Sequence, residues 1–244
     1  SRYEEIQISK QRNIMTILCI ETSTNCCSAA ITINGEAQAI RANLTGANHA
    51  SELPLFVEEL MNEARSNNWK IDAVALSQGP GSYTGLRIGA SLAKGLCYGL
   101  NIPLIPVDTL QILCAAAVTQ HLPQNALLCP MLDARRMEVY TSIYTRECAR
   151  TRDIEAKIID EHAFETELNE QTICFFGNGA SKCKDFIQSD NAHFIDGILP
   201  QAQYMGALAE QLPQLDIKQV AYYEPFYLKE FVAAPSHIKG LETK

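Results

Sequence analysis

Short apolar runs alternate with polar turns along the first half of the chain, in the pattern of a mixed α/β unit. The elements predicted in order are strands at 13–23, 27–35 and 36–44, a helix at 51–65, a strand at 72–78, a helix at 82–100 and a strand at 103–107. Asn34-Gly35 favours a two-residue hairpin between the second and third strands, and Ser51 is expected to cap the first helix. Three antiparallel strands followed by helix, strand, helix and strand is the order of a ribonuclease-H-like half.

The second half repeats this order more loosely. Its predicted elements are two strands within 125–145, a strand at 155–160, a helix near 163–170, a strand at 172–177, a helix near 180–189, a strand at 193–196 and a helix near 201–212. Laying one half over the other aligns Glu21 with Asp133 at the ends of matching strands. We therefore expect two α/β lobes of the actin, Hsp70 and sugar-kinase type, each a mixed sheet flanked by helices. Their expected bounds are 14–107 and 108–244, with 1–13 as an extension and the last helix packing back on the first lobe.

The stretch "GPGSYTGLRIG" at 79–89 resembles a phosphate loop but matches neither standard kind. It lacks the lysine of a Walker loop, and Thr84 stands where the dinucleotide fingerprint needs its third glycine. On the helix that follows, Gly85, Ile88, Gly89 and Leu92 share one face. Small residues there allow another backbone to approach closely, either that of the lobe's own sheet or that of a partner protein.

Carboxylates and hydroxyls at the strand ends are candidates for binding a nucleotide. Glu21 is followed by Thr22-Ser23-Thr24, and Asp133 is followed by Ala134 and Arg135. Across a cleft, two carboxylates could hold magnesium while hydroxyls and backbone N–H groups meet the phosphates. The turn "GNGAS", with Gly177 and Gly179, could cradle an anion. The alternative is that these residues only form hydrogen-bonded turns at the ends of strands.

Composition narrows the class of protein. The formal net charge is −8, with 20 Lys and Arg against 28 Asp and Glu, which makes the chain a poor nucleic-acid binder by itself. Nine cysteines occur without a CxxC pair, which is typical of buried thiols in a reducing compartment such as the cytoplasm. No apolar run is long enough to cross a membrane. The five histidines lack the spacing of metal ligands, so no metal is expected.

Several motifs together resemble one known family. In order they are "ILCIETST" at 17–24, "GPGSYTGLRIG" at 79–89, "GLNIPLIPVDTL" at 99–110, "DARRMEVY" at 133–140, "GNGA" at 177–180 and "EPFYLKE" at 224–230. They are similar to those of the TsaB family, also called YeaZ, over about residues 14–235. Met137 departs from the family pattern, which has a glycine there.

The resemblance implies a non-catalytic subunit of the complex that makes N6-threonylcarbamoyladenosine at position 37 of tRNA. The implied partners are the paralogous transferase TsaD and the ATPase TsaE, with a homodimer when TsaD is absent and contact with tRNA only through the complex. TsaD-like proteins carry a metal-binding HxxxH whose positions fall here on Thr109 and Leu113, neither of which ligates a metal in this way. The chain should therefore lack the metal and the transferase activity.

The resemblance also implies a helical interface with the partner. Its candidate residues lie on the helices at 51–65 and 82–100: Leu53, Leu55, Phe56, Leu60, Thr84, Gly85, Arg87, Ile88, Gly89, Ser91 and Leu92. A bulky residue at Gly89 is expected to break the pairing and leave the fold soluble.

Two other functions stay open on the sequence. One is an ATPase or phosphotransferase that uses Glu21 and Asp133, with ATP or ADP and magnesium at a degenerate or shared site. The other is a glycoprotease-type peptidase, which the missing HxxxH disfavours.

Overall fold

The first half of the chain builds a five-stranded mixed sheet. The computed structural model describes residues 14–229, and the strand order of this sheet is β3-β2-β1-β4-β5. Its strands are β1 (Thr16–Glu21), β2 (Cys27–Ile33), β3 (Glu36–Asn43), β4 (Ala73–Gly79) and β5 (Leu104–Asp108). The first three pair antiparallel, and β4 and β5 run parallel to β1. Asn34 and Gly35 both have positive φ, 51° and 80°, as a tight hairpin between β2 and β3 requires.

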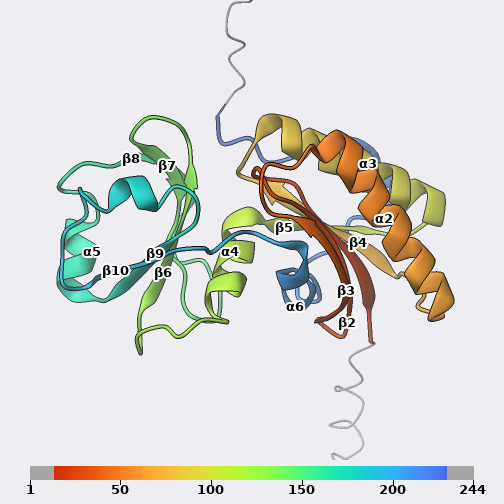
Figure 1. Cartoon of the computed structure of the whole chain (residues 1–244), viewed down its shortest axis with the longest axis horizontal. Coiled ribbons are helices and arrows are strands. Elements are labelled where there is room, and N and C mark those ends of the chain that lie inside the picture. The colour runs from red at the N-terminus through yellow and green to blue at the C-terminus, as the bar shows by residue number, and fades with distance from the viewer. Residues whose placement is uncertain (1–13, 230–244) are drawn as a thin grey trace, which may run out of the picture.

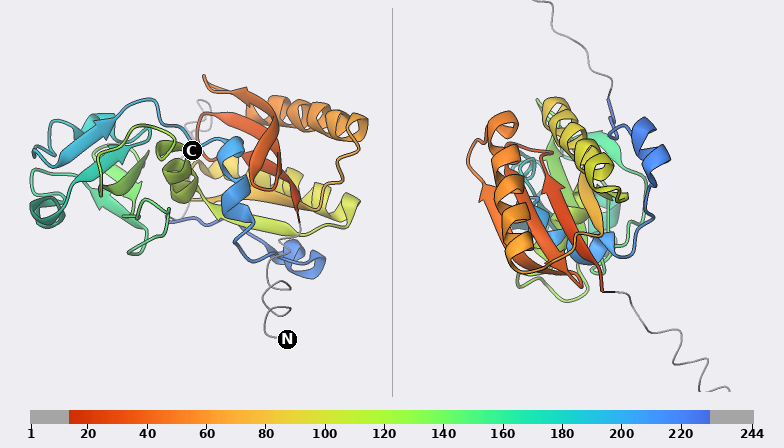
Figure 2. Two further views of the ribbon diagram at one scale, coloured as in Figure 1. Left: turned by 90° about the horizontal axis from the view of Figure 1, so that it is seen from below. Right: turned by 90° about the vertical axis from the view of Figure 1, so that its right-hand side faces the viewer.

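Two long helices cover one face of this sheet. α2 (His49–Ser66) and α3 (Tyr83–Leu100) run side by side across it (Figures 1 and 2). Residues from both helices share a hydrophobic core with Leu18, Ile31 and Leu76 of the strands. α2 begins one turn earlier than its apolar stripe indicates, at the N-cap Asn48 rather than Ser51.

The other face of the same sheet is covered by segments from later in the chain. α4 (Thr109–Ala117) contributes Ile112, and the short helices η2 (Ala202–Tyr204) and α6 (Gly206–Ala209) contribute Ala202, Met205 and Ala209. The Ser28 hydroxyl accepts a hydrogen bond from the Ala202 N–H at 2.9 Å. α7 (Ile217–Tyr222) then places Val220 in the core beneath α2 and α3. Residues 202–222 therefore belong to the first lobe in space, although they follow the second in sequence.

The second sheet has the same topology as the first. Its strands are β6 (Leu127–Asp133), β7 (Glu138–Thr141), β8 (Glu155–Ile158), β9 (Ile173–Phe176) and β10 (Ala192–Ile195). Read from the other edge, their order is β8-β7-β6-β9-β10. This matches the order β3-β2-β1-β4-β5 of the first sheet strand for strand, with β6 in the place of β1. The two ribonuclease-H-like lobes predicted from the sequence are thus confirmed, and β1 and β6, which end at Glu21 and Asp133, are equivalent.

Helices match the sequence prediction less well in the second half. The region 180–189 contains only the 3-10 turn η1 (Ser181–Cys183), and α5 (Glu165–Glu170) is short. Ala180, Cys183 and Ile187 are buried in this region at helical spacing, while Phe186 is exposed. The apolar stripe is therefore present, but the chain forms only a single 3-10 turn along it. The helix expected near 201–212 is divided between η2 and α6.

α4 joins the two lobes. Leu110 and Leu113 pack into the core of the second lobe, whereas Ile112 packs into that of the first. The Asp108 side chain caps the helix by accepting from the Leu110 N–H at 2.8 Å, and the buried Tyr144 hydroxyl of the second lobe donates to the same carboxylate at 2.7 Å. One helix thus contributes to both cores.

Two further observations concern the cysteines and the helices. All nine cysteines are buried and form no disulfide. In the part of the chain that the structure describes, no helix is both long and apolar enough to span a bilayer.

Candidate functional site

The turn after β1 holds the first group of predicted site residues and is closed to solvent. Glu21 is fully buried, and its Oε1 accepts from the Ser23 N–H at 2.6 Å and from the Ser23 hydroxyl at 2.5 Å. The Glu21 Oε2 is buried and has no hydrogen-bond partner within residues 14–229. Thr22, Ser23 and Thr24 are also buried. This set therefore presents no exposed ligating group.

Glycines of the following turn and helix lie directly against this buried turn. A Cβ on Gly81 would come within 2.3 Å of the Ser23 carbonyl oxygen, and one on Gly85 within 2.1 Å of the Thr22 carbonyl oxygen. A Cβ on Gly89 would lie 2.4 Å from the Thr22 Oγ1. The glycine motif that resembles a phosphate loop is thus a close contact between α3 and the end of β1.

These contacts correct two expectations. A nucleotide cannot reach Glu21, Thr22 or Ser23 in this conformation, because the Gly79–Gly81 turn and α3 occupy the space in front of them. Gly89 faces its own lobe, so a bulky replacement would disturb the fold and not selectively the pairing with a partner.

The burial of Glu21 predicts a pH-dependent stability. Burial raises the pKa of this carboxyl from 4.5 to about 7, against the opposing effect of the Ser23 hydrogen bonds. The ionised form is therefore disfavoured in the folded state, and stability is highest below pH 4.5 and falls as the pH rises to about 7. Glu21→Gln should be more stable than the parent protein at pH 8, by up to about 3 kcal/mol, and by no more than about 1 kcal/mol at pH 5.

Urea unfolding of both proteins at pH 5 and pH 8 measures this difference. Glu36→Gln, which removes an exposed carboxylate from the hairpin, serves as the control and should show the same small change at both pH values. A Glu21→Gln protein without any gain at pH 8 would contradict the buried, disfavoured carboxylate.

The end of β6 holds the second group of predicted site residues, around Asp133. The Lys182 ammonium pairs with the Asp133 carboxylate and also donates to the carbonyl oxygens of Arg136 at 2.7 Å and Glu138 at 2.8 Å. Arg135 is exposed on the same turn with φ of 72°. The carboxylate that was expected to hold magnesium is thus bound to a lysine side chain, which ties the 133–138 turn to η1.

Gly177 and Gly179 also serve packing at this site. A Cβ on Gly177 would lie 2.4 Å from the Met131 carbonyl oxygen, and one on Gly179 would lie 2.9 Å from the Asp133 nitrogen. The Asn178 side chain between them accepts from the Asp133 N–H at 3.0 Å. This turn therefore packs against the end of β6 and hydrogen-bonds to it. Its geometry is that of a hydrogen-bonded turn at a strand end and gives no support to an anion-binding site.

The positions that match the paralogue's HxxxH lie one turn apart on α4. Thr109 and Leu113 are both fully buried, and Leu113 is part of the second lobe's core. Within residues 14–229, no group of three or more His, Cys, Asp and Glu side chains is arranged to hold a metal ion. The side chains at this place in the fold supply packing and no ligands.

The predicted interface residues divide into two groups. Leu53, Leu60, Gly85 and Gly89 are buried within the first lobe, which removes them as contact residues. The others are exposed or partly exposed on α2 and α3: Leu55, Phe56, Thr84, Arg87, Ile88, Ser91 and Leu92. We call this second group the α2–α3 face. Leu55 is its most prominent apolar side chain, at 56% exposed.

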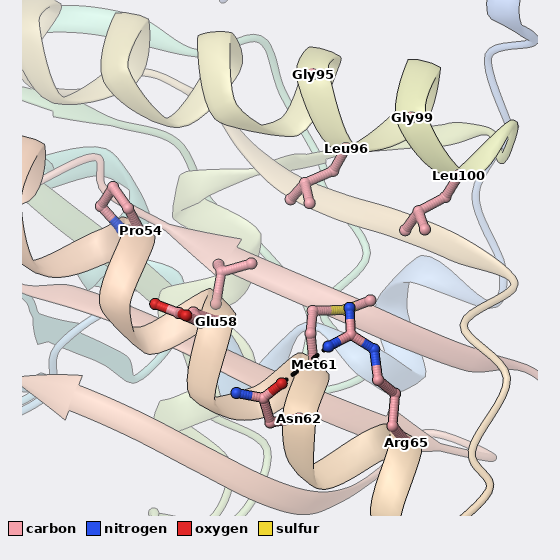
Figure 3. A pocket seen from close by; sticks show the side chains of 10 residues that line it. Pro54, Glu58, Met61, Asn62, Arg65, Gly95, Leu96, Gly99 and Leu100 are labelled. Carbon is pink, nitrogen blue, oxygen red and sulfur yellow. Dashed lines mark hydrogen bonds between the residues drawn. The ribbon is translucent and has the colours of Figure 1, made fainter.

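A groove of about 450 Å³ lies between α2 and α3. None of the residues that line it belongs to the α2–α3 face. Leu96 and Leu100 of α3 point across it toward α2, and Met61 and Arg65 of α2 form the opposite wall (Figure 3). Gly95 and Gly99 also line it, and a Cβ on either would meet nothing within 4 Å. The four glycines of α3 thus serve different purposes, because Gly85 and Gly89 admit the lobe's own backbone whereas the last two leave a surface recess open.

Lys182 and the residues that line the groove were not among the site residues predicted from the sequence. Lys182 lies 49 positions from Asp133, so no local pattern joins them. Gly95 and Gly99 lie one turn apart on α3, as Gly85 and Gly89 do, so their spacing does not distinguish an open recess from close packing.

Comparisons with known proteins cover both lobes. A family model described as TsaD, tRNA N6-adenosine threonylcarbamoyltransferase, matches residues 40–235. The tRNA threonylcarbamoyladenosine biosynthesis protein TsaB of Haemophilus influenzae is 33% identical over 228 residues, which are 89% of this chain and 95% of that protein. TsaB of Escherichia coli is 30% identical over 227 residues, 90% and 96% of the two chains. The solved structure of YeaZ from Pseudomonas aeruginosa is 25% identical with a TM-score of 0.73, and covers 88% of this chain and 100% of that one.

Proposed function

Because the chain belongs to the TsaB family of tRNA threonylcarbamoyladenosine biosynthesis proteins, we propose that it is the non-catalytic subunit that pairs with a TsaD-like transferase. Its part in making this tRNA modification follows from the family, and the pairing and the absence of catalysis are the proposal. The observation that carries the pairing is the α2–α3 face, where Leu55 stands exposed beside an open groove.

The arrangement of this face suits a helical partner. Two parallel ridges with a recess between them accept the side chains of another helix pair, as ridges fit into grooves. The same surface could pair with a second copy of itself around a twofold axis, which gives a homodimer when the transferase is absent. A TsaE-like ATPase would join the heterodimer.

The non-catalytic role is supported by the side chains at the positions where a related enzyme would bind a metal or a nucleotide. Thr109 and Leu113 are buried packing residues, Glu21 is enclosed, and Asp133 is paired with Lys182. Any ATP or ADP with magnesium would have to bind at a surface shared with the partner, because the turn after β1 is filled. The net charge of −8 favours contact with tRNA only through the complex. Nine unpaired, buried thiols suit the reducing cytoplasm.

Reconstitution of the modification tests the proposal. TsaC-, TsaD- and TsaE-like proteins are combined with a tRNA that reads codons beginning with A, with and without this chain, and the modified nucleoside is measured by mass spectrometry. We expect modification only when the chain is present, and none when the chain is the sole protein. Full modification in its absence would contradict the proposal.

The two alternatives have their own signatures in the purified chain. An ATPase or phosphotransferase would turn over nucleotide alone and lose this turnover in Glu21→Ala. A glycoprotease-type peptidase would bind zinc and show chelator-sensitive cleavage. Neither result is expected from the enclosed Glu21 and the buried Thr109 and Leu113.

A further inference from the structure

A second, more polar cleft lies where residues 223–227 pass across α3. It has a volume of about 300 Å³ and is separate from the groove between α2 and α3. The side chains that matter for its chemistry come from both segments: Tyr83, Arg87 and Lys94 of α3, and Tyr223, Glu224 and Tyr227 of the crossing segment. None of the groove residues recurs among them.

Two cations in this cleft, Arg87 and Lys94, have no acidic partner among the described residues. The Arg87 Nη1 donates to the Tyr83 hydroxyl at 2.6 Å, and the Arg87 guanidinium lies over the Tyr83 ring, 5.2 Å from its centroid. The Lys94 ammonium donates to the Ala221 carbonyl oxygen at 3.2 Å. Over residues 14–229, neither cation forms an ion pair with a carboxylate. Each therefore keeps N–H donors for a further acceptor.

Tyrosines complete the site. The rings of Tyr83 and Tyr227 lie 4.9 Å apart and hold the Arg87 side chain in place at one end. At the other, Tyr223 is 9% exposed, and its hydroxyl oxygen is buried without a hydrogen-bond partner in the described part of the chain. A buried hydroxyl with no partner is rare in a folded protein, and since Tyr223 lines the cleft, this hydroxyl is a hydrogen-bond donor for a group bound there.

The local charge indicates the kind of group. Arg87 and Lys94 carry two positive charges and Glu224 one negative charge, so the cleft has a net charge of +1 in a chain whose net charge is −8. A carboxylate with a single negative charge brings this site to neutrality, whereas a phosphate with two would leave it with a net charge of −1. The planar Arg guanidinium also matches the geometry of a carboxylate.

Arg87 belongs at the same time to the α2–α3 face. Ser91, one turn further along α3, lines the cleft as well and is also part of that face. We propose that the cleft receives an aspartate or glutamate side chain of the paired protein, which fixes the orientation of the two subunits. This inference rests on the proposed pairing, and names the chemistry by which one end of that interface is recognised.

Charge-removing variants test it in the full chain. The dissociation constant for the TsaD-like partner is measured by calorimetry for the parent protein, Arg87→Met, Lys94→Met and the control Lys70→Met. Lys70 is exposed outside the cleft, so its variant removes the same charge elsewhere. We expect at least about tenfold weaker binding for Arg87→Met and Lys94→Met, and an unchanged constant for the control. Because Arg87→Met removes one positive charge from the interface, it should also make the affinity for the partner less dependent on salt concentration.

The outcomes separate this inference from the proposed function. If the parent protein pairs and both cleft variants pair equally well, the carboxylate site is wrong and the subunit role stands. If the parent protein does not pair at all, the proposed function fails, and the inference fails with it. Acetate and inorganic phosphate are added as competitors to identify the chemistry. Stronger competition by phosphate at equal ionic strength would overturn the assignment to a carboxylate.

Discussion

Replacing Gly85 with alanine is expected to lower the free energy of unfolding by about 2 kcal/mol or more, although alanine favours helices. The new methyl carbon would lie 2.1 Å from the Thr22 carbonyl oxygen. Neither segment can yield easily, because the Thr22 hydroxyl donates to the Gly85 carbonyl oxygen at 2.8 Å and both residues are buried. Urea denaturation of the purified chain measures the change.

The matched control is the same substitution at Gly95, nearly three turns further along the same helix. A Cβ at Gly95 meets nothing within 4 Å, so only the helix propensity changes. Gly95→Ala should therefore raise the free energy of unfolding by about 0.5 to 1 kcal/mol. Equal effects at the two positions would show that Gly85 does not lie against the end of β1.

Replacing Leu55 with glutamate is expected to weaken pairing with the TsaD-like partner at least about 30-fold, since a central apolar side chain would be exchanged for a charge without a partner. Leu55 is 56% exposed in the isolated chain, so the stability of the fold should change by no more than about 0.5 kcal/mol. Calorimetry with the partner gives the affinity, and light scattering of the chain alone shows whether a homodimer is lost as well.

Ile158→Glu is the control for this prediction. Ile158 is 70% exposed, on β8 of the second lobe, well apart from α2 and α3 (Figure 1). It should leave pairing unchanged. If the two variants bind the partner equally well, the α2–α3 face is not the interface.

The strands could be predicted because their signal is local. Most strands in each lobe are short runs rich in apolar residues and bounded by turns, and Asn34-Gly35 specifies its hairpin by itself. α4 was missed for the opposite reason. Its sequence, TLQILCAAA, is buried on nearly every side, so there is no polar face to produce helical periodicity.

The state of the candidate site could be predicted only in part. The sequence placed Glu21 and Asp133 at equivalent strand ends, as the two sheets confirm. It could not show that the turn after β1 is closed, because Gly81 and Gly85 approach it from about 60 positions away. Nor could helical spacing decide which glycines face inward, since the inward pair and the open pair occur on one continuous helix.

The return of residues 202–209 to the first sheet has a consequence for biosynthesis. Ala202, Met205 and Ala209 cover Ile17, Cys19 and Ala75, which precede them by more than 120 positions in the sequence. Domains generally fold as units in the order in which they leave the ribosome. Here α4 covers part of one apolar face of the first sheet, and the rest of that face stays uncovered until residues 202–209 have been synthesised. A ribosome that stalls before residue 202 therefore releases a lobe that cannot complete its own core.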